Sequence, residues 1–223
     1  MADDAATVAL LDLVLPPACL GCRSRGTLLC DRCLASLRSP SEPADRFVAA
    51  DAGIVIGAHL ALGVAAFAYE GPLRRALAQL KYEGAGRVAS ILARACLPSF
   101  RTLVAVAGTS VLAPVPVHVE RLRSRGYNQA GLIASELGRA TGLPVRNLLV
   151  RARSTARQHR LDRTSRFHNL RGAIAMTPGA IAPRSVIVVD DIITTSATLD
   201  ACAAVLLEAG SEVVYGYAVA REV

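Results

Sequence analysis

The segment Val186–Leu199, with the sequence VIVVDDIITTSATL, constrains the fold of this chain more than any other segment. Its first four residues are β-branched, which is typical of a strand buried on both faces of a parallel sheet. Asp190 and Asp191 follow directly, at the carboxyl end of the strand, where open α/β sheets bind ligands. The segment therefore predicts an α/β domain with a polar site at this edge of its sheet.

The residues after the acidic pair suit a phosphate group. They carry hydroxyls and lead into a predicted helix, whose first N–H groups point outward at the positive end of its dipole. The two carboxylates would instead accept hydrogen bonds from vicinal hydroxyls and could hold the water shell of a Mg²⁺ ion. A sugar with a phosphate at one end and hydroxyls at the other meets both requirements. The loop residues expected to bind it are Thr194, Thr195, Ser196, Ala197 and Thr198.

Other interpretations of a strand that ends in two acids fit the sequence less well. A Walker B strand needs a partner G-x-x-x-x-G-K-[ST], but the only lysine, Lys81, is followed by Tyr82. A dinucleotide site is weakly suggested by Gly84 and Gly86, but no third glycine follows. The plain structural alternative is a chance cluster of helix-capping residues after a buried strand.

The rest of the chain is consistent with an α/β domain preceded by a small appendage. Of the 223 residues 52% are hydrophobic and only 4% aromatic, so Ala, Val and Leu must build the core. We expect a separate unit over residues 1–38, a linker over 39–52 and the α/β domain over 53–223. No run of 18 uncharged apolar residues occurs, and Asp3 and Asp4 stand where a secretory signal would be basic. We therefore expect a cytoplasmic protein without membrane insertion.

Local patterns also predict the elements of the domain. Strands are expected within 54–69, over Val111–Val117, from Leu148, over Ser185–Val189 and over Glu212–Val219; helices are expected from Pro72 to Leu80 and over Val88–Leu97, Asn128–Thr141 and Thr198–Ala209. Arg151–Arg171 shows no apolar periodicity, and a long loop inside a compact domain favours a functional lid.

Positive charge is concentrated in one part of the chain. The net charge is +7, and Arg121–Arg171 alone holds twelve arginines against Glu136 and Asp162. This stretch favours an anionic partner, either the phosphates of a small ligand or nucleic acid. A solvated basic face is the simpler alternative.

The appendage contains two C-x-x-C pairs separated by seven residues. Four thiolates at this spacing predict a closed, structural Zn²⁺ site, which would fold a segment too short to build its own core. Disulfides or a redox pair are the alternatives. The expected ligands are Cys19, Cys22, Cys30 and Cys33, whereas Cys96 and Cys202 lie in apolar runs and are expected to be core residues.

At Val186–Leu199 the chain resembles the type I phosphoribosyltransferases, whose signature is an apolar run, two acids, two variable residues and a Thr/Gly-rich loop. Ser196 stands where that loop usually has Gly. Other segments resemble one subfamily, the ComF (late-competence ComFC, GntX-like) proteins, although Ile174 replaces a usual aromatic. These segments are FAYEGP at 67–72, LKYEG at 80–84, PVP at 114–116, RLRSRGYNQ at 121–129 and the stretch 155–172.

The resemblance implies a type I phosphoribosyltransferase fold, a mainly parallel sheet flanked by helices, and binding of phosphoribosyl pyrophosphate with Mg²⁺. It implies that Pro114–Arg125 faces the pyrophosphate and that Arg151–Arg171 is a mobile catalytic loop. On the pyrophosphate side we expect Arg121, Arg123, Arg125 and Lys81, although Lys81 could equally be a surface residue at a helix end. The expected catalytic residues are Asp190, Asp191, Arg163 and Arg166.

Two functions of different classes follow from this resemblance. The first is a phosphoribosyltransferase that passes a 5-phosphoribosyl group to an unidentified acceptor and releases pyrophosphate. The second is a non-catalytic accessory protein of DNA uptake and competence, which binds single-stranded DNA or a helicase partner. Assembly as a homodimer is compatible with both.

Overall fold

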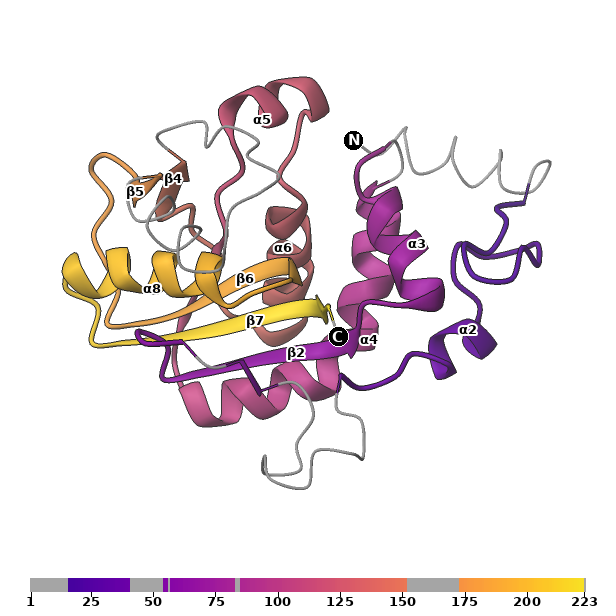
Figure 1. The fold of residues 1–223 in the computed structure, drawn as a ribbon, viewed down its shortest axis with the longest axis horizontal. Helices are drawn as coiled ribbons and strands as arrows, with labels where there is room; N and C mark the ends of the chain where they lie inside the picture. Colours follow the sequence, from indigo (N-terminus) through magenta and orange to yellow (C-terminus); the bar gives the residue numbers. More distant parts are fainter. Residues whose placement is uncertain (1–15, 41–53, 56, 83–84, 152–172, 223) are drawn as a thin grey trace.

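The computed structural model describes residues 16–40, 54–55, 57–82, 85–151 and 173–222. Its centre is a five-stranded sheet in the order β1-β2-β7-β6-β3 (Figure 1). Neighbouring strands are parallel except for β1, which pairs antiparallel with β2. The strands are β1 (Ile54–Val55), β2 (Leu62–Ala68), β3 (Val111–Pro114), β6 (Ser185–Ile193) and β7 (Val213–Arg221).

Helices and a small second sheet surround the central one. The helices are α2 (Asp31–Ala35), α3 (Gly71–Gln79), α4 (Ala85–Ala107), α5 (Val119–Arg125), α6 (Gln129–Thr141) and α8 (Ala197–Glu208). The small sheet pairs β4 (Leu149–Arg151) antiparallel with β5 (Ile174–Met176).

Alternate residues of β6 enter two different cores, because successive side chains of a strand point to opposite faces. Ile187 and Val189 join a buried cluster with residues of α3, α4 and α6. Val186 and Val188 join a second cluster with residues of α8, β4 and β5. Figure 1 shows α8 on one side of the sheet and α4 on the other. Both faces are therefore covered, which confirms the predicted α/β class with a mainly parallel sheet flanked by helices.

Helix α4 is longer than the sequence predicts. The apolar pattern predicts a helix over Val88–Leu97, and the next residue, Pro98, cannot donate a backbone hydrogen bond. The helix nevertheless continues to Ala107, and Phe100 and Leu103 beyond the proline are buried in the same cluster as Leu92. Packing of this face offsets the lost hydrogen bond. By length and composition alone α4 could also cross a membrane, but 39% of its most apolar window is buried within the fold.

Several predictions fall partly or wholly outside the described residues. These are most of the linker, the first fifteen residues and all of the predicted lid except Arg151. Arg163 and Arg166 belong to this group. The division into residues 1–38, 39–52 and 53–223 stays a prediction.

Candidate functional site

The acidic pair lies inside the last part of β6 rather than after it. The sequence predicts a strand that ends at Val189, but β6 continues to Ile193 because β7 extends beside it as far as Arg221. In this register Asp190 is opposite Ala218 of β7. The pair therefore stands on a rigid strand at the carboxyl edge of the sheet.

Asp190 is held in a setting that disfavours its charge. Its Oδ1 accepts a 2.8 Å hydrogen bond from the backbone N–H of Asp191, whose own Oδ1 accepts one of 2.9 Å from Ile192. Burial, and next the neighbouring Asp191 carboxylate, raise the pKa of Asp190 well above its usual range, while the backbone N–H of Asp191 and the cationic Arg151 act in the opposite direction. A cation or ligand hydroxyls at this place would relieve the repulsion between the two acids.

The loop between β6 and α8 consists of Thr194, Thr195 and Ser196, and the helix starts at Ala197. Ser196 occupies the N-cap position but makes no side-chain capping hydrogen bond. Thr194 is exposed, and Thr198 is half-buried in the first turn of the helix. The structure therefore brings the acidic pair and the predicted hydroxyl residues together at one edge of the sheet.

The arginines expected on the pyrophosphate side lie on a short helix, α5, which sequence analysis did not predict. The side chains of Arg121 and Arg123 are exposed on α5, and Arg125 donates a 3.0 Å hydrogen bond to Gln129 Oε1. The positive charge of Arg121 contributes, after burial, to a lowered pKa of Arg151 on β4. Helix α5 therefore lies close enough to β4 for their charges to interact.

Lys81 lies at the end of α3, and its side chain is exposed. The hydroxyl of Tyr127 donates a 2.8 Å hydrogen bond to the carbonyl oxygen of Tyr82, the next residue. This bond ties the end of α3 to the segment between α5 and α6. No direct contact of Lys81 with the acidic pair is seen among the described residues.

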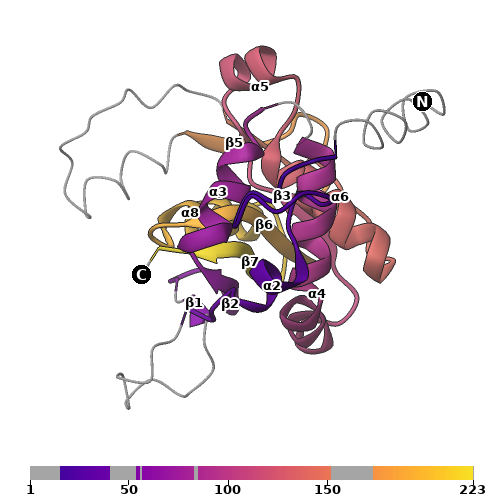
Figure 2. The same ribbon diagram turned by 90° about the vertical axis from the view of Figure 1, so that its right-hand side faces the viewer.

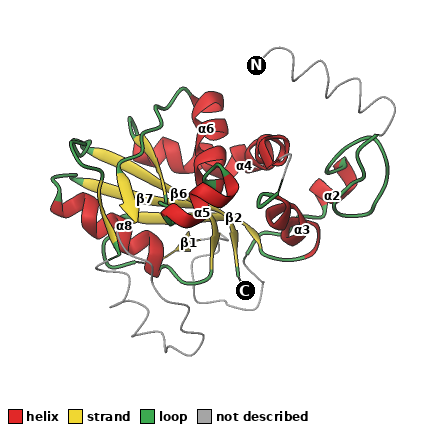
Figure 3. Ribbon diagram, turned by 90° about the horizontal axis from the view of Figure 1, so that it is seen from above, coloured by secondary structure: helices red, strands yellow, loops and turns green. Residues whose placement is uncertain are grey.

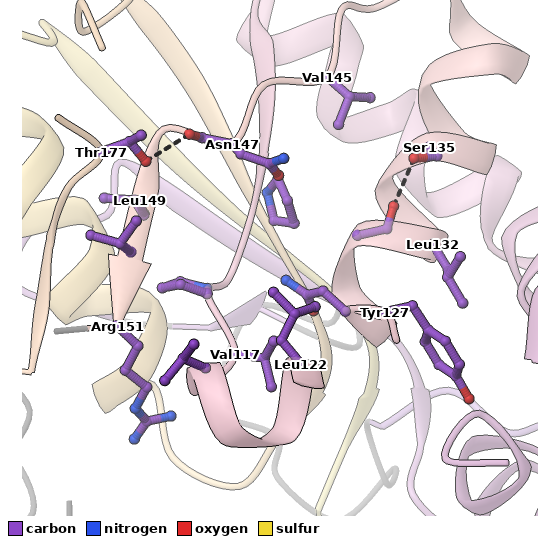
Figure 4. Close-up of a pocket in the computed structure, with 16 residues that line it drawn as sticks. Val117, Leu122, Tyr127, Leu132, Ser135, Val145, Asn147, Leu149, Arg151 and Thr177 are labelled. Atoms are coloured by element: carbon purple, nitrogen blue, oxygen red, sulfur yellow. Dashed lines mark hydrogen bonds between the residues drawn. The ribbon is translucent and has the colours of Figure 1, made fainter. Parts of the chain in front are cut away.

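An open pocket of about 670 Å³ lies between α5, α6 and β4 (Figure 4). Its wall contains neither the acidic pair nor the β6–α8 loop, but it does contain Arg151, whose charge acts on Asp190. The pocket therefore lies beside the predicted site. Sequence analysis missed this role of Arg151 because it assigned the residue to the lid. The lining residues are Pro114, Pro116, Val117, Val119, Leu122, Tyr127, Asn128, Gly131, Leu132, Ser135, Val145, Asn147, Leu149, Val150, Arg151 and Thr177.

The four cysteines of the appendage converge. Their Sγ atoms all lie within 4.8 Å of one another, and those of Cys22 and Cys30 are 3.6 Å apart. Four sulfurs at zinc–thiolate distances would be about 3.8 Å apart in a tetrahedron, so the cluster fits a closed tetrahedral site. All four are free thiols, in agreement with a metal site rather than disulfides. The residues present can therefore hold a structural metal ion.

The thiols of the cluster differ in acidity. A hydrogen bond from Ser24 is the main cause that lowers the pKa of Cys22 to about 5. Burial is the main cause that raises the pKa of Cys33 to about 12, with further contributions from the other three cysteines. A bound cation would stabilise all four thiolates, including that of Cys33.

The cysteine cluster packs against the α/β domain. Arg75 of α3 donates hydrogen bonds of 2.6 and 2.8 Å to the carbonyl oxygens of Leu20 and Gly21. Cys19 and Cys33 are buried in one cluster with residues of α3. Figure 3 shows α2 beside α3, and in Figure 2 the segment that carries the cysteines passes in front of the α/β domain. A Cβ on Gly21 would lie only 2.4 Å from the Cys33 sulfur, so this close packing requires glycine.

Comparison with known proteins gives relatives over much of the chain. It is 31% identical to the DNA utilization protein YhgH of Escherichia coli K12 over 159 residues, which is 69% of each protein. It is 34% identical over 113 residues to competence protein F of Haemophilus influenzae, and the match spans about half (49%) of that relative. It is 37% identical over 101 residues to competence protein ComFC of Bacillus subtilis, covering 45% of this chain and 39% of that protein.

Other comparisons add less. No family model matches the chain. One solved structure, described as the allosteric regulatory enzyme of purine biosynthesis, is similar with a TM-score of 0.38 and 19% identity over 64% of this chain and 30% of that one. This likeness is too distant to support an argument.

The strand order and the acidic pair at the carboxyl edge of β6 define an α/β protein with a mainly parallel sheet, flanked by helices, and a polar site at its edge. A small cysteine cluster that could bind a metal precedes this fold. Within the class, the chain belongs to the ComF family, together with competence protein F and the DNA utilization protein YhgH.

Proposed function

We propose that this chain binds 5-phosphoribosyl pyrophosphate at the carboxyl edge of β6 and transfers its 5-phosphoribosyl group to an acceptor. The observation that carries the proposal is the placement of Asp190 and Asp191 directly before a hydroxyl-bearing loop at the start of α8. This edge offers oxygen ligands for hydroxyls or a cation and, a few residues further on, N–H groups for a phosphate.

The proposed roles follow from charge. Thr194, Thr195, Ser196 and Thr198, with the N–H of Ala197, would hold the 5-phosphate, and the two aspartates would hold the ribose hydroxyls and a Mg²⁺ ion. The bond from the sugar carbon to pyrophosphate breaks through an oxocarbenium-like centre, and a bond to the acceptor forms. Negative charge grows on the departing pyrophosphate, so Arg121, Arg123 and Arg125 would stabilise the transition state more than the ground state. Lys81 would add charge on this side, and by family resemblance Arg163 and Arg166 would act in catalysis.

Calorimetric titration with phosphoribosyl pyrophosphate and Mg²⁺ tests the proposal. We expect binding by the wild type and a loss of at least about 10-fold for Asp191→Ala, because its carboxylate contact is removed. Glu208→Ala, which removes an exposed acid at the far end of α8, is the matched control and should bind like the wild type. Absence of binding by the wild type would refute the proposed ligand. Release of pyrophosphate with a panel of bases and amines would then separate an enzyme from a binding protein.

A second candidate function is suggested by the relatives named for competence and DNA utilization. We propose as the alternative an accessory role in DNA uptake, with single-stranded DNA or a helicase as the cytoplasmic partner. It is supported by the exposed arginines of α5 and by Tyr82, which is 64% exposed beside Lys81. An exposed aromatic ring next to a cation suits stacking on an unpaired base. DNA binding of this kind should weaken steeply between about 50 and 200 mM salt and should not need Thr194.

The cysteine cluster has its own proposed ligand. We propose Zn²⁺, because four thiolates form the closed tetrahedral set that zinc prefers in structural sites. A structural role agrees with the packing of Cys19 and Cys33 in one buried cluster with residues of α3. A homodimer stays a prediction.

A further inference from the structure

Asp200 is the one charged residue that is fully buried among those the structure describes. It lies in the first turn of α8, just after the residues proposed to hold the phosphate. A buried carboxylate is costly unless it is paired and hydrogen-bonded. Its surroundings should therefore satisfy both of its oxygens.

His59 satisfies both oxygens of this carboxylate. The backbone N–H of His59 donates a 2.7 Å hydrogen bond to Asp200 Oδ1, and His59 Nδ1 lies 2.9 Å from Oδ2. These residues are 141 positions apart in the chain. His59, in the segment before β2, thus makes two hydrogen bonds to the first turn of α8.

Gly57 allows His59 to approach Asp200 this closely. A Cβ at Gly57 would lie 2.5 Å from Asp200 Oδ1, which is too close for any side chain. The segment from Gly57 to Leu60 therefore follows the carboxylate closely. Leu60 lies within van der Waals contact of a Cβ placed on Gly216 of β7, so the segment is also packed on the sheet.

The hydrogen bonds between His59 and Asp200 influence the β6–α8 loop through the first turn of α8. The backbone N–H of Asp200 donates a 2.8 Å hydrogen bond to the carbonyl oxygen of Ser196, the last residue of the loop. Any rotation of Asp200 about the helix axis would therefore turn Ser196 and the first N–H groups of α8. A negative charge one turn from the helix start would also repel a bound phosphate, and hydrogen bonds from His59 disperse that charge.

We propose that His59 and Asp200 form a clamp that positions the β6–α8 loop for the 5-phosphate of the ligand. This inference rests on the proposed function, and it assigns both as positioning residues. The clamp acts on the phosphate end of the ligand only. Its loss should therefore affect ligands that carry the 5-phosphate and spare pyrophosphate, which is proposed to bind near α5.

Titration of the full chain with ribose 5-phosphate and, separately, with Mg²⁺–pyrophosphate tests the clamp. We expect His59→Ala to weaken ribose 5-phosphate about 10-fold and to leave pyrophosphate within about twofold. His59→Asn should recover most of the loss, since its side-chain amide can donate from nearly the same place as Nδ1. Gly57→Ala keeps both clamp residues but displaces the carboxylate, and it should reproduce the loss. The matched control is Arg184→Ala, which breaks the 2.6 Å ion pair with Glu212 at the opposite end of the sheet.

The outcomes of these titrations distinguish failure of the clamp from failure of the proposed function. Wild-type affinity for ribose 5-phosphate in folded His59→Ala and Gly57→Ala would overturn the clamp and leave the proposed function intact. Equal losses for ribose 5-phosphate and pyrophosphate would also overturn it, because they indicate a general loss of structure. A wild type that binds neither ligand would refute the proposed function and the clamp with it.

Discussion

The backbone N–H of Val115 donates a 2.8 Å hydrogen bond to the carbonyl oxygen of Val189, the residue before Asp190. The side-chain amide of Asn128 donates another of 2.8 Å to the carbonyl oxygen of Val115. Residue 115 is thus tied on one side to the strand of the acidic pair and on the other to the start of α6. Helix α5 is built on the chain between these two anchors, so its arginines start beside the proposed site.

We expect Arg121→Ala and Arg123→Ala each to weaken binding of Mg²⁺–pyrophosphate about 3- to 10-fold, because each removes a cation that can contact phosphate. Ribose 5-phosphate should bind as before. Calorimetry at two salt concentrations measures both ligands, and the losses should shrink at high salt. Arg139→Ala, which removes an exposed arginine paired with Glu136 on α6, serves as the control. Equal losses for both ligands would contradict the assignment of α5 to the pyrophosphate side.

Asp190→Asn should stabilise the fold and abolish Mg²⁺-dependent binding. The pKa of Asp190 is raised above 3.8 in the folded chain, so the native state holds a proton that the unfolded state releases. The stability due to this proton is complete below the ordinary pKa and is lost as pH rises through the raised one. Above it the half-buried carboxylate beside Asp191 costs free energy, and we expect the asparagine variant to gain on the order of 1 kcal/mol at neutral pH.

Urea unfolding across pH checks this expectation. The difference in free energy of unfolding between Asp190→Asn and the wild type should grow as pH rises and vanish in acid. Asp200→Asn is the useful comparison, because it removes a buried carboxylate that is paired with His59 and should destabilise the fold instead. A constant difference across pH would show that Asp190 does not carry the expected proton.

The cysteine cluster should hold one zinc ion per chain. Native mass spectrometry before and after chelation should show the loss of that mass, and chelation should lower the melting temperature because the cluster packs against α3. Cys22→Ser should weaken metal binding strongly. Cys96→Ala, which removes a buried thiol outside the cluster, should keep the metal. An unchanged mass with four oxidised thiols would refute the zinc site.

Arg75→Ala should loosen the attachment of the cysteine cluster to the domain, because it removes the hydrogen bonds to Leu20 and Gly21. Loss of about 1 kcal/mol would speed local opening about fivefold, which hydrogen exchange at the amides of residues 19–35 can measure. Arg74→Ala is the matched control on the same helix, since Arg74 lies over the Tyr69 ring instead. Equal exchange in both variants would place the attachment in apolar packing alone.

The sequence was most informative where structure is local. The β-branched run before Asp190 and the helix after Ser196 are set by neighbouring residues. The start of the strand and both ends of the helix were predicted to within one residue. Helix α5 was missed because it buries no residue and so shows no apolar period. Its ends depend on His118, whose Nδ1 accepts from the Glu120 N–H, and on Gly126 with φ of 79°.

Pairings between distant segments could not be predicted. Arg151 belongs to β4 because it pairs with Ile174, a partner on the far side of residues 152–172. Asp200 looks like an ordinary helix residue until His59 is placed against it. The last strand residues of β6 likewise depend on the length of β7. In each case the structure depends on a partner residue that is distant in the sequence, and no local sequence pattern identifies that partner.

The cysteine cluster and helix α3 share one buried cluster, which contains Cys19, Leu29, Cys33, Leu73 and Leu77. This shared core has a consequence for how long the protein persists in the cell. A chain without the proposed zinc ion would leave the apolar side of α3 uncovered, and such surfaces are what chaperones and proteases recognise. Newly made copies would then survive in proportion to the metal they capture. The supply of zinc in the cell would thus set the abundance of this protein through its rate of degradation, without any change in its synthesis.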